Sequence, residues 1–144
     1  MKKLLSLIMS CTLFSSCNAK SLESEISNWL VNLTQNNNIP EDIIALNFGM
    51  FESDKGRSIY LTGSKVYDEN NDDWACEIDF EPVNKYLTPT SKSVRQMDWQ
   101  EFQSQVILII AKCLKTNNQV RSWIANRIVT AGFDDGELTR ITNK

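Results

Sequence analysis

An acidic segment between residues 68 and 81 carries the side chains best suited to chemistry or binding. It has no basic residue, and its carboxylates are Asp68, Glu69, Asp72, Asp73, Glu77, Asp79 and Glu81. Alternating carboxylates can coordinate calcium, but a calcium loop also needs glycine at its sixth position, where this segment has Asp73. Paired carboxylates can hydrolyse a glycoside if a pocket raises the pKa of one of them, and no pattern here marks such a pocket.

Two other interpretations of this segment stay open. Its carboxylates could simply be solvated, or they could form a docking surface for a basic protein. The alternation of residues 74–80 predicts a strand, which would hold Glu77 and Asp79 in fixed positions on its outer face. Carboxylates in the preceding loop would mainly steer the encounter with a cationic partner. We predict that the docking surface consists of Asp72, Asp73, Glu77 and Asp79.

The chain lacks the usual catalytic residue sets. It contains no histidine, which is the commonest general base near neutral pH and the commonest metal ligand. No G-x-S-x-G pattern occurs, and the Ser64-Lys65 and Ser91-Lys92 pairs are adjacent and not helically spaced. We therefore expect a non-enzymatic protein with no catalytic residue, no cofactor and no bound metal.

The N-terminus predicts export and lipid attachment. Lys2 and Lys3 precede an apolar run from Leu4 to Phe14, which is too short to span a membrane, where about 20 apolar residues are needed. Phe14-Ser15-Ser16-Cys17 resembles a lipobox, so residues 1–16 are expected to be a lipoprotein signal peptide. Acylation of Cys17, for instance with palmitate, would anchor the protein to a membrane. The alternative is ordinary cleavage and a freely secreted product.

Export has consequences for charge and for cysteine chemistry. Loss of residues 1–16 removes two of the 15 basic residues and none of the 18 acids, which leaves a net charge of −5. That charge argues against nucleic acid as a partner and permits a cationic protein. In an oxidising compartment Cys76 and Cys113 could form a disulfide, although they could equally be small apolar core residues.

The hydrophobic patterns predict an α+β fold, with a mostly antiparallel sheet of about five strands packed by two or three helices on one face. Residues 17–21 form a tether and residues 22–144 a single domain. Helices are expected at 22–35, from Asp98 to Lys115, and at 119–125; strands are expected at 43–51, 57–67, 74–80, 127–133 and 137–141. The segment 82–97 is expected to be a loop. Trp29, Trp74 and Trp99 are expected in the core.

Several short motifs resemble a small family of bacterial α+β proteins that we associate with immunity proteins of polymorphic-toxin systems. They are Ile39-Pro40-Glu41-Asp42, Asn47-Phe48-Gly49, Tyr60-Leu61-Thr62-Gly63-Ser64, Asp72-Asp73-Trp74-Ala75-Cys76 and Ala131-Gly132-Phe133-Asp134-Asp135-Gly136-Glu137-Leu138. The resemblance implies a compact, non-enzymatic domain that binds and blocks a toxin. Most such proteins are cytosolic, and the signal peptide departs from that pattern.

Together these features predict a lipid-anchored binding protein of the cell envelope, facing the periplasm or the cell surface. Its expected role is to inhibit a cationic toxin or hydrolase. The alternative is an accessory or structural lipoprotein in a larger envelope complex.

Overall fold

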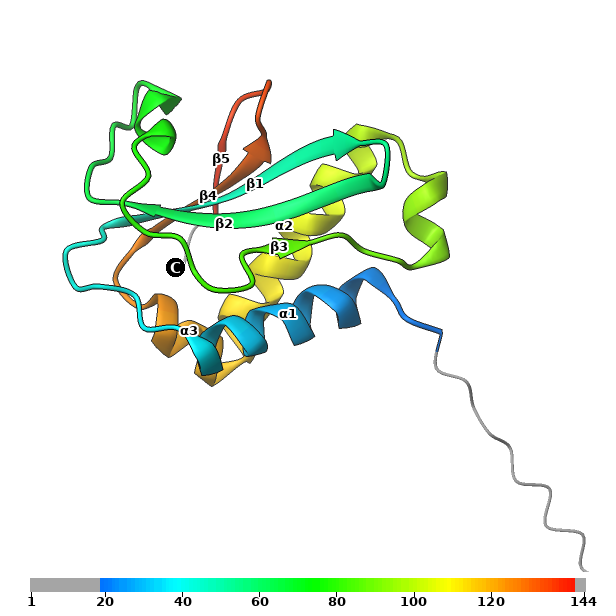
Figure 1. Ribbon diagram of the computed structural model, residues 1–144, viewed down its shortest axis with the longest axis horizontal. Coiled ribbons are helices and arrows are strands. Elements are labelled where there is room, and N and C mark those ends of the chain that lie inside the picture. The colour runs from blue at the N-terminus through cyan, green and yellow to red at the C-terminus, as the bar shows by residue number, and fades with distance from the viewer. Residues whose placement is uncertain (1–18, 142–144) are drawn as a thin grey trace, which may run out of the picture.

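A computed structural model describes residues 19–141, in which three helices pack on one face of a five-stranded sheet (Figure 1). The predicted α+β fold with a mostly antiparallel sheet is therefore confirmed. The predicted signal peptide, residues 1–16, and Cys17 lie outside the described residues. No helix within residues 19–141 is both long enough and apolar enough to cross a membrane. The elements are α1 (Leu22–Asn36), β1 (Ala45–Ser53), β2 (Gly56–Ser64), β3 (Tyr86–Leu87), α2 (Trp99–Thr116), α3 (Asn118–Ile124), β4 (Ile128–Phe133) and β5 (Thr139–Ile141).

The sheet has the strand order β3-β2-β1-β4-β5, so β1 lies at its centre. β1 and β2 form an antiparallel hairpin in which Phe48 is opposite Leu61. On its other side β1 pairs with β4 in parallel, and there Phe48 is opposite Ala131. A parallel pair requires a long crossover connection, and the chain from β2 through α2 and α3 supplies it.

The helices begin where their capping residues predict. Ser21 and Ser24 form a reciprocal capping box at the start of α1, and the Asp98 side chain accepts a hydrogen bond from the Glu101 backbone N–H at the start of α2. Each helix buries one stripe of apolar residues. In α1 these are Leu22, Ile26, Trp29, Leu30 and Leu33, and in α2 they are Phe102, Val106, Ile109, Ile110, Cys113 and Leu114.

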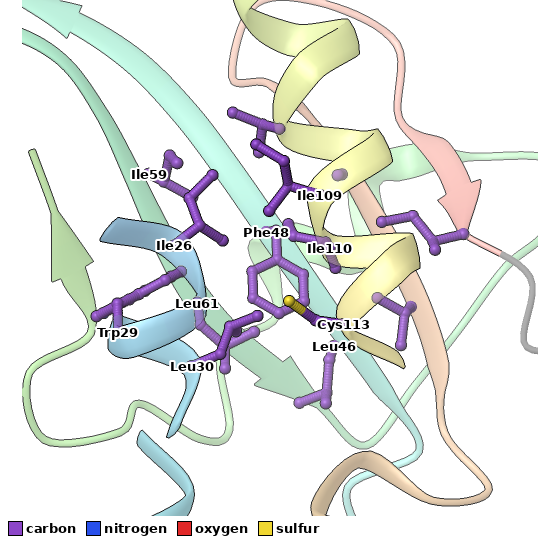
Figure 2. Close-up of a cluster of buried hydrophobic side chains, with 14 of the residues drawn as sticks. Ile26, Trp29, Leu30, Leu46, Phe48, Ile59, Leu61, Ile109, Ile110 and Cys113 are labelled. Atoms are coloured by element: carbon purple, nitrogen blue, oxygen red, sulfur yellow. The ribbon is translucent and has the colours of Figure 1, made fainter. Parts of the chain in front are cut away.

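The apolar stripes of α1 and α2 meet the sheet in one continuous core. Figure 2 shows Phe48 of β1 at the centre of this core, between the side chains of α1 and those of α2. Ile59 and Leu61 of β2 extend the same apolar layer and are fully buried. The core therefore fixes which face of the sheet the helices cover, and leaves the other face for different contacts.

The segment 82–97 differs from the predicted plain loop, since it contains β3 and a short 3₁₀ helix, η2 (Lys92–Gln96). Glu25 of α1 fastens this segment to the helix layer. Its carboxylate accepts hydrogen bonds from the Thr90 N–H (2.8 Å), the Thr90 hydroxyl (2.8 Å) and the Ser91 N–H (3.0 Å). Burial would raise the pKa of Glu25, but these hydrogen bonds outweigh that effect and lower it below its ordinary value.

Candidate partner-binding surface

The two faces of the sheet differ because successive side chains of a strand point to opposite sides. Leu46, Phe48 and Met50 of β1 lie in the core under the helices. The face on the other side is here called the open face, because in Figure 1 none of the three helices lies on it. On β1 and β2 its residues are Asn47, Gly49, Phe51, Ser58, Tyr60 and Thr62. Asn47, Gly49, Ser58 and Thr62 are buried, and only Phe51 and Tyr60 are partly exposed.

The segment 65–80, here called the cap, lies on the same side of the sheet as the open face (Figure 1). Trp74 anchors the cap, since it is only 5% exposed and its ring lies 5.2 Å from that of Tyr67. Asp72 fastens it to the residue before β5 by accepting a hydrogen bond from the Leu138 N–H (2.9 Å). Asp79 joins the end of the cap to its beginning by accepting a hydrogen bond from the Lys65 N–H (2.9 Å).

The predicted strand at 74–80 is wrong. Residues 72–76 form a short 3₁₀ helix, η1 (Asp72–Cys76), whose start is capped by the Asn71 side chain. Beyond it, the only sheet contact is an isolated bridge between Phe80 and Gly63. The Gly63 carbonyl accepts hydrogen bonds from both the Asp79 and the Phe80 N–H, and such a shared acceptor differs from a regular ladder. Local capping by Asn71 therefore prevailed over the alternating pattern.

This correction changes the predicted docking surface. Asp72, Asp73, Glu77 and Asp79 are all exposed on the cap, but no strand holds Glu77 and Asp79 on a common outer face. Asp72 and Asp79 have structural roles, because Asp72 fastens the cap to Leu138 and Asp79 joins the end of the cap to its beginning at Lys65. Among the described residues, the Asp73 carboxylate accepts one hydrogen bond, from the Asn71 side-chain amide two residues away (3.1 Å), so it remains exposed to a partner.

Within residues 19–141, no group of three or more His, Cys, Asp or Glu side chains is arranged to hold a metal ion. Glu77 follows η1 directly and is exposed, and among the described residues its carboxylate makes no hydrogen bond or ion pair. Glu77 and Asp73 are thus the two predicted residues best placed to meet a partner.

Three aromatic rings form a cluster on the open face that the sequence did not indicate. Phe51, Tyr60 and Tyr86 lie on β1, β2 and β3, and each pair of ring centroids is separated by 6.1–6.2 Å. Tyr86 is 56% exposed, although aromatic rings are usually buried. The rings are far apart in sequence, and only the pairing of the three strands brings them together, so a sequence pattern could not reveal the cluster.

Tyr60 connects this aromatic cluster to the β4–β5 turn. Its ring lies across Gly49, where an added Cβ would be 2.0 Å from the Tyr60 ring carbon Cζ. Its hydroxyl donates a hydrogen bond of 2.5 Å to Asp134. Burial, followed by the hydrogen bond to Asp134, raises the pKa of Tyr60 well above its ordinary value. Tyr60 therefore stays protonated and donates to the carboxylate throughout the physiological range.

Of the two alternatives for Cys76 and Cys113, the disulfide is not formed in the structure, where both cysteines are free. Cys76 is exposed on η1, in the cap, whereas Cys113 is buried on α2 in the core. The Cys113 thiol lies 3.4 Å from the Ser27 hydroxyl of α1. Because the cap and the helices lie on opposite sides of the sheet (Figure 1), the two thiols belong to different layers.

No protein-family model, no curated protein and no solved structure matches this chain.

Proposed function

We propose that this chain is a non-enzymatic, lipid-anchored protein of the bacterial cell envelope that binds and neutralises a cationic toxin or hydrolase. The observation that carries the proposal is the open face, where a partly exposed aromatic cluster lies on the same side of the sheet as the acidic cap. Protein interfaces are enriched in aromatic residues at their centre and are surrounded by a polar rim. The cluster would supply that centre, and the carboxylates of the cap would supply part of the rim.

The charge of the chain favours a cationic partner. The expected mature chain has a net charge of −5. Lys65 and Lys85, the lysines that flank the cap, already form ion pairs with Asp42 (2.8 Å) and Glu81 (2.5 Å). Their positive charge is therefore largely compensated. The Arg140 guanidinium lies 5.9 Å from the Tyr67 ring of the cap, and the more numerous carboxylates of the cap outweigh this single charge. The resulting negative field accelerates the encounter with a basic protein. The resemblance of the short motifs to immunity proteins supports the same class of function.

Reversing the charge of Asp73 and Glu77 should weaken binding without unfolding the cap, because neither carboxylate fastens it to the sheet. We expect the Asp73→Lys, Glu77→Lys double variant to associate about 10-fold more slowly at low salt, and less so as salt screens the charges. The measurement is stopped-flow association and calorimetry against each secreted protein encoded beside this gene, followed by protection of cells that produce the same protein.

A matched control separates the surface from the net charge. The Glu41→Lys, Glu101→Lys variant changes the charge by the same amount, but at the turn that precedes β1 and at the start of α2, where both glutamates are exposed. It should retain most of the association rate. Equal loss in both variants would show that the cap is not the contact surface. If none of the neighbouring secreted proteins is bound, the proposed inhibition is wrong, and an accessory role in an envelope complex takes its place.

The membrane anchor has its own test. Cells fed labelled palmitate should incorporate it into the wild-type protein and not into Cys17→Ser, because only that cysteine follows the lipobox-like motif. Cys11→Ser is the control and should keep the label, since Cys11 lies in the apolar run that is removed with the signal peptide. Label retained in Cys17→Ser would refute the anchor.

A further inference from the structure

A cleft of about 520 Å³ opens where the end of β1, the start of α2 and the β4–β5 turn converge. It lies beside the aromatic cluster, since Phe51 belongs to both and Asp134 at its rim accepts the Tyr60 hydrogen bond. Its walls combine three aromatic rings with three carboxylates: Phe51, Trp99, Phe133, Glu52, Asp134 and Asp135. No lysine or arginine is among the described residues that line it.

Trp99, which lines this cleft, is unusually exposed for a tryptophan. The sequence predicted it in the core, yet its side chain is 49% exposed. One edge contact with Phe133, at 5.9 Å between ring centroids, holds the indole at the start of α2. A large apolar ring with half its area exposed, at the side of a cleft, is available to a ligand group.

The three carboxylates differ in how far they are already engaged. Glu52 is paired with Arg57 at 2.6 Å, and Asp134 accepts the Tyr60 hydroxyl. Asp135 has no hydrogen bond or ion pair from its side chain within the part of the chain that is described. The cleft therefore offers one uncompensated carboxylate, and one partly engaged, next to an exposed indole.

Elsewhere in the same chain, a cation lies between a carboxylate and an aromatic ring. The Lys85 ammonium lies between the Glu81 carboxylate (2.5 Å) and the ring of Tyr86 (4.8 Å to its centroid). The cleft presents the same two kinds of surface, with Asp135 as the carboxylate and Trp99 as the ring. None of the described residues that line the cleft is a cation, so a partner molecule is the source of the cation considered for this site.

We infer that this cleft binds an arginine side chain of the partner protein, an inference that rests on the proposed function and names the chemistry of the contact. A guanidinium is flat and weakly hydrated, so it stacks on aromatic rings more readily than an ammonium does. It also directs two N–H groups toward a carboxylate at once. In this cleft the guanidinium of an arginine stacks on the Trp99 ring and pairs with the Asp135 carboxylate.

The test titrates the full-length purified protein with three short peptides, Gly-Arg-Gly, Gly-Lys-Gly and Gly-citrulline-Gly, all with blocked ends. Citrulline keeps the shape of arginine and lacks its charge. The readout is the indole N–H signal of Trp99 in NMR spectra, assigned by its loss in Trp99→Phe. We expect a saturable shift with the arginine peptide at a Kd on the order of 1 mM, a weaker shift with lysine and none with citrulline.

Variants then locate the carboxylate. Asp135→Asn should weaken binding of the arginine peptide roughly fivefold, as expected for a solvent-exposed charge pair. Glu41→Gln removes a carboxylate outside the cleft and should leave the Kd unchanged. Absence of a Trp99 shift, an equal shift with citrulline, or an unchanged Kd in Asp135→Asn would overturn the inference.

The outcome of this test is separate from that of the proposed function. If a toxin is bound and neutralised while the arginine peptide leaves Trp99 unaffected, only the cleft inference is lost. If the peptide binds at Trp99 and Asp135 while no neighbouring secreted protein is bound, the cleft stands and the inhibitory function is wrong.

Discussion

Phe48→Ala is expected to lower the free energy of unfolding by about 3–5 kcal/mol. Phe48 is fully buried on the central strand, and its ring makes an edge contact with Trp29 of α1 at 6.0 Å. Figure 2 places it between the side chains of α1 and α2, so its removal leaves a cavity that borders three elements. Close packing from three sides prevents the neighbours from filling that cavity.

Urea unfolding followed by circular dichroism measures this loss, which is a large part of the 5–15 kcal/mol typical of a domain. Leu108→Ala serves as the control, since Leu108 is also in the helix-and-sheet unit but is 62% exposed on α2. Its stability should change by no more than about 0.5 kcal/mol. Similar losses in both variants would mean that Phe48 is not at the centre of the core.

Arg127→Ala should cost about 3 kcal/mol, because one guanidinium holds three segments of the chain together. Arg127 lies half-buried just before β4, and each of its N–H donors faces a backbone carbonyl. Its Nε bonds to Ile43 at 2.8 Å, and its two terminal nitrogens bond to the carbonyls of Ile39, Pro40, Trp123 and Ala125. The arginine thereby joins the end of α3 to the turn that leads into β1.

Arg127→Lys should recover less than half of this loss, because a lysine ammonium keeps the charge but cannot reach carbonyls on both sides. Arg95→Ala is the matched control. Arg95 is exposed on η2 and makes no hydrogen bond or ion pair within the described residues. Thermal unfolding should show little change for Arg95→Ala. If Arg127→Lys unfolds at the same temperature as the wild type, the positive charge alone joins the segments, and the several N–H donors of the guanidinium are not needed.

The helices and the fold class were predictable from sequence because their determinants are local. The apolar residues of α1 recur at helical spacing, and Ser21 and Asp98 cap helices that begin within a residue of the predicted starts. The hairpin of β1 and β2 follows from two apolar runs around a short turn, in which Gly56 adopts a positive φ of 116°. Each of these signals comes from residues that are close together in the sequence.

The prediction failed where distant segments decide the structure. The alternation at 74–80 indicated a strand, but among the described residues its only strand pairing is the single bridge between Phe80 and Gly63, and its first three residues belong to η1. The apolar spacing of α2 placed Trp99 in the core, yet it lies at the first position of the helix and is 49% exposed, with its ring against Phe133 of β4. Whether the Trp99 side chain is buried depends on how β1 and the β4–β5 turn lie beside the start of α2.

The sequence by itself determined the acidic character, the helices and the α+β class, because charge, composition and helical periodicity are properties of short stretches of chain. Lipid attachment at Cys17 remains a prediction from the sequence. The tertiary structure decided that the acids lie on a cap, that Phe51, Tyr60 and Tyr86 meet, and that Trp99 lines a cleft with Asp135. These contacts join β1, β2, β3, α2 and the β4–β5 turn. Strand order and register decide which of these residues meet. Both depend on the parallel pairing of β1 with β4, two strands that are far apart in the sequence.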